Sequence, residues 1–345
     1  MTYREVLQNA RKNMAPNCRV CRECNGVACR GEIPGTGGKG SGASFIRNCR
    51  RLAQIKINMD LIYEDRGQDT SATLFGRKFA APVFAAPISG LGVNYNGFLN
   101  ERTYAQALVP GCIEAGCAAF TGDGAPDFYL TDPLAAVKAA GGRAVPTVKP
   151  WDAETLRAKM DLVKESGAMA MAMDIDAAGL PLLAAAGKPV RAKTVAELTK
   201  ITAYAERPFL LKGIMTPAAA LKALECGAYG IVVSNHGGRV IDQTPATVEV
   251  LPAIRKAVGG RMKVFLDGGI RTGLDVFKAL ALGADAVLIG RPYVIAACGG
   301  GKEGVSLYTK KIIAELKDAM KMTGCAALAD ITPDKVVDLG PAAEL

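Results

Sequence analysis

Histidine is nearly absent from this 345-residue chain, which contains only His236, and aromatic residues make up only 6%. The low aromatic content argues against a nucleic-acid-binding surface, which combines basic residues with aromatic side chains that stack on bases. No apolar run in the sequence approaches the ~18 residues of a membrane-spanning helix, and the polar amino-terminal segment does not fit a signal peptide. We therefore expect a cytoplasmic protein that binds neither nucleic acid nor membrane.

Hydrophobic residues make up 50% of the chain and charged residues 22%, which is enough apolar material for a large core. The net charge of +9 is uneven, because residues 1–51 carry ten Lys or Arg against three Glu. This basic segment is also rich in cysteine and glycine. We expect two parts, a cysteine-rich amino-terminal extension over residues 1–70 and a larger domain over residues 71–345.

Four of the ten cysteines follow the spacing C-x2-C-x2-C-x4-C, at Cys18, Cys21, Cys24 and Cys29. In a reducing compartment such a group is more typical of a metal site than of disulfides. Arginines interleaved with the cysteines favour thiolates, which are the form that binds metals. An iron–sulfur cluster is the first interpretation, because the two-residue gaps are similar to those of ferredoxins; structural zinc is second, and unmetallated thiols remain possible.

Beyond residue 80, apolar strand patterns alternate with helical patterns. This arrangement predicts a (β/α)8 TIM barrel, with a doubly wound sheet as the alternative. The expected helices cover residues 101–115, 153–166, 194–205, 217–226, 248–258 and 273–282, and a further short helix covers residues 2–13. The expected strands are 83–86, 118–121, 144–148, 168–173, 209–211, 231–233, 264–266 and 286–289.

The single histidine follows one of these strands. Ile231–Val233 is a buried-strand pattern, and the glycines after His236 predict a loop at the carboxyl end of that strand. An imidazole there can remove a proton from a substrate carbon, while Arg239 holds a neighbouring carboxylate with two parallel hydrogen bonds. The alternative is an exposed loop with a solvated His and Arg.

The last two units, FLDGGIRTGLD and AVLIGRP, each place glycine and arginine between a strand and a helix. Backbone N–H groups, positive helix ends and guanidinium groups together favour a phosphate site. The alternative interpretation is a pair of tight turns.

Long stretches of the chain resemble the FMN-dependent 2-hydroxy-acid oxidases and dehydrogenases, a family that includes lactate, glycolate and mandelate enzymes. The resemblance covers about residues 74–323 and is strongest in LLKGIMTPAAA, VVSNHGGRVID and LDGGIRTGLDVFKALALGADAVLIGRP. It implies that the domain over residues 71–345 is an FMN-binding barrel. It further implies that the enzyme oxidises a small 2-hydroxy acid or reduces a 2-oxo acid.

The resemblance also implies roles for individual residues. His236 would be the base and Arg239 the carboxylate anchor. Asp176 would hold the protonated His236, and Lys212 would lie beside the flavin N1/O2 edge. The implied FMN-binding residues are Pro87, Ile88, Ser89, Thr121, Lys212, Ser234, Asp267, Gly269, Arg271, Gly290 and Arg291.

The substrate half of the pattern departs from the family. Val148 and Lys149 stand where the family has a tyrosine, Asp174 stands in place of a threonine, and the cysteine-rich segment replaces another tyrosine. Two alternatives therefore remain open: an FMN-dependent isomerase that resembles type 2 isopentenyl diphosphate isomerase, and a flavin and iron–sulfur redox partner. We expect an electron-acceptor partner and a homo-oligomer.

Overall fold

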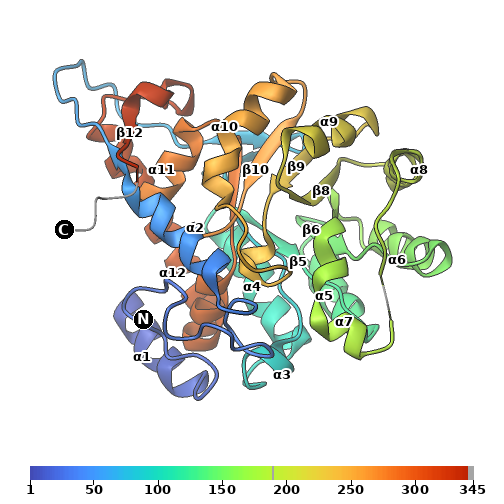
Figure 1. Ribbon diagram of the computed structural model, residues 1–345. Coiled ribbons are helices and arrows are strands. Elements are labelled where there is room, and N and C mark those ends of the chain that lie inside the picture. Colours follow the sequence, from blue (N-terminus) through green and yellow to red (C-terminus); the bar gives the residue numbers. More distant parts are fainter. Residues whose placement is uncertain (189, 341–345) are drawn as a thin grey trace.

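The centre of the computed structural model, which describes residues 1–188 and 190–340, is a closed barrel of parallel strands (Figure 1). The strands follow one another around the barrel in chain order, and β11 pairs with β4 to close it. The predicted (β/α)8 barrel is therefore confirmed. Its strands are β4 (Val83–Ala85), β5 (Ala118–Thr121), β6 (Ala144–Val148), β7 (Met171–Asp174), β8 (Phe209–Ile214), β9 (Gly230–Val233), β10 (Lys263–Leu266) and β11 (Ala286–Ile289).

Aromatic side chains fill the amino-terminal end of the barrel. The rings of Phe84, Phe120 and Phe265 lie 5.9 to 6.2 Å apart, centre to centre. A hairpin of β2 (Ala72–Leu74) and β3 (Arg77–Phe79) places Phe75 between its strands, with its ring stacked 5.8 Å from Phe265. These rings close the amino-terminal end of the barrel. Polar groups lie at the opposite end, at the carboxyl ends of the strands, where barrel enzymes bind their substrates.

Helices surround the barrel, and the expected ones agree with the structure to within two residues. Three long helices were not predicted: α2, which carries several arginines, α5, which contains Pro133, and α12, which is interrupted at Gly300 and Gly301. The main helices are α2 (Ala43–Gln54), α4 (Glu101–Glu114), α5 (Phe128–Ala139), α6 (Ala153–Glu165), α8 (Val195–Ala205), α9 (Pro217–Glu225), α10 (Thr247–Val258), α11 (Gly273–Ala281) and α12 (Arg291–Lys321).

Short helical elements lie in the loops. They are α3 (Leu91–Asn94), α7 (Pro181–Ala185), and the 3-10 turns Ile175–Gly179, His236–Gly238, Leu328–Asp330 and Pro333–Lys335. Within the described ranges, no helix combines the length and apolarity that crossing a membrane requires.

The amino-terminal extension is joined to the end of the chain. Helix α1 (Tyr3–Asn13) lies along α12, and the side-chain amides of Asn9 and Asn13 donate to the carbonyls of Gly299 and Cys298. Strand β1 (Ile55–Ile57) pairs antiparallel with β12 (Val336–Asp338). The cysteine-rich segment lies beside the carboxyl ends of the barrel strands, where Nε of Arg271, which follows β10, donates to the carbonyl of Cys24. A domain boundary at residue 70 stays a prediction.

Candidate active site

A cavity of about 330 Å³ opens at the carboxyl ends of the barrel strands. It brings together residues from segments that are distant in the sequence. Of the predicted site residues, those that line it are Pro87, Ile88, Ser89, Lys212, His236, Arg239, Asp267, Gly269, Arg271, Gly290 and Arg291. Thr121 and Ser234 are buried, and Asp176 contacts the cavity through His236.

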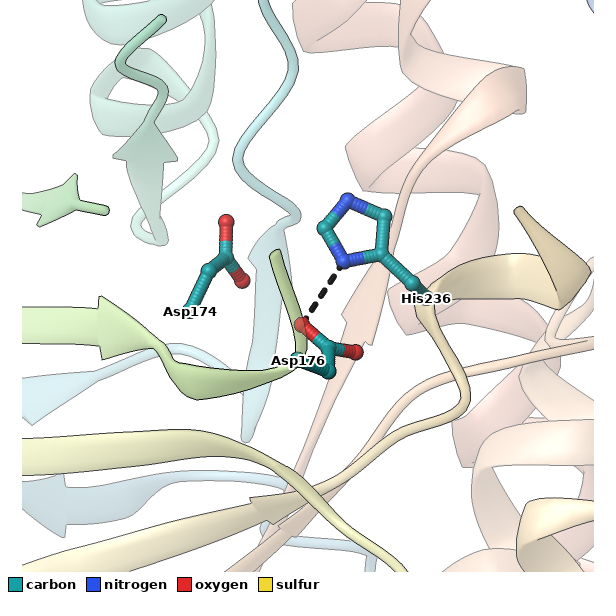
Figure 2. Close-up of side chains that lie close together, drawn as sticks. All are labelled: Asp174, Asp176 and His236. Atoms are coloured by element: carbon teal, nitrogen blue, oxygen red, sulfur yellow. Dashed lines mark hydrogen bonds and ion pairs between the residues drawn. The ribbon is translucent and has the colours of Figure 1, made fainter. Parts of the chain in front are cut away.

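The imidazole of His236 is oriented by a carboxylate. Its Nδ1 lies 2.9 Å from Oδ1 of Asp176, which follows β7, and Figure 2 shows the other ring nitrogen directed away from that carboxylate. Since a carboxylate only accepts hydrogen bonds, Nδ1 carries the hydrogen and Nε2 has a free lone pair. His236 has φ 56°, a left-handed conformation that is uncommon outside glycine and recurs at functional sites.

Two lysines contact a buried carboxylate that lies close to His236. The ammonium groups of Lys149 and Lys212 lie 2.6 and 2.8 Å from the carboxylate of Asp174. Burial alone would raise the pKa of Asp174, but these two charges outweigh it and hold that pKa below its usual range. Asp174, Asp176 and His236 lie close enough to ligate a metal ion. We interpret the group as a charge network instead, because two ammonium groups already neutralise Asp174.

The guanidinium of Arg239 faces a buried glycine-rich loop, residues 35–38. It donates to the carbonyls of Gly35 and Gly37, at 2.8 and 3.0 Å, and to Oδ1 of Asn94 at 2.8 Å. Burial, together with the nearby charge of Arg291, lowers the pKa of Arg239 to about 10. Arg239 therefore remains charged at neutral pH.

Two further arginines enclose one aromatic ring. The guanidinium groups of Arg291 and Arg271 lie 3.8 and 5.6 Å from the ring centre of Phe45. Next to them, Gly269 has φ +87°, and a Cβ at that position would lie 2.6 Å from the carbonyl oxygen of Asn48. Only glycine fits there, so the backbone between β10 and α11 stays accessible from the cavity.

The four clustered cysteines surround a second, smaller cavity. It is lined by Cys18, Cys21, Cys24 and Cys29, as well as by Tyr95 and Arg291, which also line the larger cavity. The two cavities are therefore neighbours that share a wall.

Sequence reasoning missed several residues that line the larger cavity or hold its walls. Asn94 binds Arg239, and Tyr95 and Tyr129 line the cavity. They lie in or near loops that follow β4 and β5, so position after a strand was the available signal. Asp123, which also follows β5 and lines the cavity, accepts hydrogen bonds from Trp151 Nε1 and Lys159 Nζ. These bonds give it a structural role.

Comparisons with known proteins identify the family. The model of the FMN-dependent dehydrogenase family matches residues 35–182 and 182–338. The chain belongs to this family. An L-lactate oxidase of Roseobacter sp. (strain GAI101) is 31% identical over 334 residues, covering 86% of this chain and 88% of that protein. A peroxisomal (S)-2-hydroxyacid oxidase of Arabidopsis thaliana is 50% identical over 131 residues, covering 38% of this chain and 36% of the other.

A solved structure of mandelate oxidase with (S)-2-phenylpropionate has a TM-score of 0.78 and 27% identity, and the match covers 97% of both chains. The resemblance to FMN-dependent 2-hydroxy-acid enzymes is thus confirmed, whereas the comparisons do not favour the isomerase alternative. This member of the FMN-dependent dehydrogenase family is an oxidoreductase.

The cavity fits FMN. Asp267 lines the cavity, and its Oδ1 is buried without a hydrogen-bond partner among the described residues, as expected of an atom that meets a polar ligand. Thr121 Oγ1, at the end of β5, is likewise buried and has no partner in the described part of the chain. The guanidinium groups of Arg271 and Arg291, with the bare backbone at Gly269, suit a phosphate. Lys212 is positively charged, because nearby carboxylates outweigh its burial and raise its pKa.

Proposed function

We propose that this protein oxidises a small 2-hydroxy acid to the corresponding 2-oxo acid. The observation that carries the proposal is one cavity lined by both His236, a base held by a carboxylate, and Arg239, a partly buried guanidinium. A base and a carboxylate anchor are the two groups that the reaction requires from the protein. Relatives whose names specify L-lactate and (S)-2-hydroxy acids support this substrate class.

His236 is the proposed proton acceptor. Nε2 takes a proton from the substrate, and the resulting imidazolium is stabilised through Nδ1 by Asp176 at 2.9 Å. FMN, when bound, would serve as the acceptor of the electron pair. Lys212, whose ammonium group is held 2.8 Å from the carboxylate of Asp174, would lie beside the flavin N1/O2 edge and would offset negative charge there.

Arg239 is the proposed carboxylate anchor. Its two terminal nitrogens point at neutral oxygens of Gly35, Gly37 and Asn94. A substrate carboxylate offers a charged acceptor in the same fork geometry, and hydrogen bonds to charged partners are roughly twice as strong as neutral ones. Substrate therefore competes favourably for this guanidinium.

The substrate side chain has an apolar environment. Leu180, Leu182 and Leu183, from the segment around α7, line the same cavity, together with Tyr129. We propose that the enzyme prefers 2-hydroxy acids with an apolar side chain over those with a second carboxylate. Comparing kcat/KM for the two kinds of acid tests this preference.

Anaerobic mixing with a 2-hydroxy acid tests the reaction itself. We expect the visible flavin absorption to bleach as the substrate is oxidised, without any added acceptor. Flavin that stays oxidised with every 2-hydroxy acid tried would contradict the proposal and would favour the alternative, an FMN-dependent isomerase.

We also propose a metal centre at Cys18, Cys21, Cys24 and Cys29, with an iron–sulfur cluster preferred over zinc. Support comes from the common cavity that these four side chains line. The ten cysteines, all free thiols, fit a reducing compartment such as the cytoplasm. We further propose that the protein forms a homo-oligomer and passes its electrons to an acceptor partner.

A further inference from the structure

The wall between the two cavities carries a positive charge. Arg291 lines both, and its Nε donates to the carbonyl of Thr36 at 2.7 Å. Its Nη2 donates to the carbonyls of Gly37 and Gly237. Gly237 directly follows His236. One guanidinium thus connects the loop of the proposed base with the loop that follows the cysteines.

We infer that the cysteine segment holds an iron–sulfur cluster that takes electrons from the flavin and delivers them to an acidic one-electron carrier protein. This inference rests on the proposed oxidation of a 2-hydroxy acid. It adds the route by which electrons leave the active site, and with it a class of partner.

The four thiols at Cys18, Cys21, Cys24 and Cys29, as they stand, do not form the compact tetrahedron that a zinc ion requires. A tetrahedral zinc ion with Zn–S bonds of about 2.3 Å holds its sulfurs about 4 Å apart. Among residues 1–188 and 190–340, no three cysteine sulfurs lie within 4.8 Å of one another. The sulfurs that bind a cluster stand further apart, because they attach to different iron atoms.

The surroundings supply the charge that a cluster requires. Cysteine thiolates and inorganic sulfides are negative, so nearby cations stabilise them. Arg291 lines the cysteine cavity, and Nε of Arg271 donates to the carbonyl of Cys24 at 2.9 Å. Both arginines also line the larger cavity, so the two redox centres would lie on either side of the same positive wall.

The electron count follows from the chemistry of each centre. Oxidation of a 2-hydroxy acid releases two electrons and two protons. His236 accepts one proton, and the flavin accepts the electron pair with the other. A cluster carries one electron at a time, so each turnover sends two electrons singly through the cluster and reduces two carrier molecules.

The exposed surface near the cysteines suits an acidic carrier. Cys21 is exposed, as are Arg19, Arg22 and Arg30. Residues 1–51 carry ten Lys or Arg against three Glu, a net charge of +7. Complementary charge accelerates the association of electron-transfer partners and makes it sensitive to salt.

Anaerobically purified holoenzyme provides the first test, through iron, acid-labile sulfide and zinc content, and electron paramagnetic resonance after addition of a 2-hydroxy acid. We expect iron and sulfide in equal amounts and a reduced-cluster signal produced by the substrate. Stoichiometric zinc without iron, or a cluster that stays oxidised while the flavin bleaches, would overturn the inference and leave the proposed reaction standing.

Cys21→Ala is the matched variant, because its side chain is exposed and the substitution removes the ligand atom. We expect it to lose iron while the flavin still bleaches with substrate. Cys226→Ser is the control, since Cys226 lies outside the cysteine segment and its Sγ donates to the carbonyl of Ala223, and it should keep full iron. Full iron in Cys21→Ala would refute the assigned ligand set.

The partner is tested with rubredoxin, a small acidic one-electron carrier. Its reduction by the holoenzyme and substrate should slow steeply as salt rises, and Arg22→Glu should lower the rate ~10-fold at low salt. Arg66→Glu, an exposed change outside the cysteine segment, serves as the control and should change little. A rate that is independent of both salt and Arg22→Glu would exclude this docking surface.

Discussion

Nδ1 of His236 lies 2.9 Å from Oδ1 of Asp176, although the two residues are 60 positions apart in the chain. Parallel strands β7 and β9 end at the same rim of the barrel, and the loops that follow them bring the two side chains together. The contact fixes the tautomer that leaves Nε2 available to the cavity. The predicted contact between the base, His236, and the carboxylate of Asp176 is thus present in the structure. Its catalytic role can be tested.

Asp176→Asn should slow flavin reduction by substrate ~10²- to 10⁴-fold, because the amide stabilises a protonated His236 less well and can hold the wrong tautomer. KM should change little, since Asp176 does not touch the substrate. Anaerobic stopped-flow measurement of flavin bleaching gives the rate, and bound FMN should remain at the wild-type level. A wild-type rate in this variant would remove Asp176 from the mechanism.

Arg239→Ala should raise KM for the 2-hydroxy acid ~10- to 100-fold, because a charge-assisted hydrogen bond to a carboxylate is lost. Arg239→Lys should recover only part of the loss, since an ammonium group lacks the planar fork. Steady-state kinetics with Arg66→Ala as an exposed control measures the difference. Equal KM values in all three variants would show that another group holds the carboxylate.

Arg291→Ala should lower FMN occupancy, because the variant loses one of two guanidinium groups in the proposed phosphate site. We expect at least ~10-fold weaker FMN binding, measured from flavin absorbance per chain and by titration of the flavin-free protein. Arg50→Ala, an exposed change on α2, should retain full flavin. If Arg291→Ala binds FMN as tightly as the wild type, the phosphate lies elsewhere.

Glu101 should make stability depend on pH. Its Oε1 accepts the N–H groups of Gly90 and Leu91, and burial raises its pKa from 4.5 to about 7. The folded state then holds a proton that the unfolded state releases, so the free energy of unfolding falls as pH rises from about 4.5 to 7, by ~3 kcal/mol at most.

Glu101→Gln removes this titration and keeps an oxygen that can accept both hydrogen bonds. Urea unfolding at pH 5 and pH 7.5 should therefore show a smaller difference in the variant than in the wild type. An unchanged difference would assign the pH dependence to other groups.

The barrel and the order of its strands could be predicted from local patterns in the sequence. Short apolar runs alternating with amphipathic helices leave few other folds, and local patterns such as those around His236 and Gly269 are continuous in the chain. Helix α2 escaped prediction because its buried residues, such as Phe45 and Leu52, are separated by arginines within a segment that looks polar overall. The spacing of the four cysteines, likewise local, predicted a common site.

The groups that meet across long stretches of the chain could not be predicted, because their contacts depend on the fold. The contact of Arg239 with Gly35 joins residues 204 positions apart, and the contact of Arg291 with Thr36 joins residues 255 apart. No local pattern encodes such pairs, because they arise when closure of the barrel brings the amino-terminal loop over the carboxyl ends of β9 and β11. For the same physical reason, the shared wall between the cysteine cavity and the flavin cavity could be seen only in the folded chain.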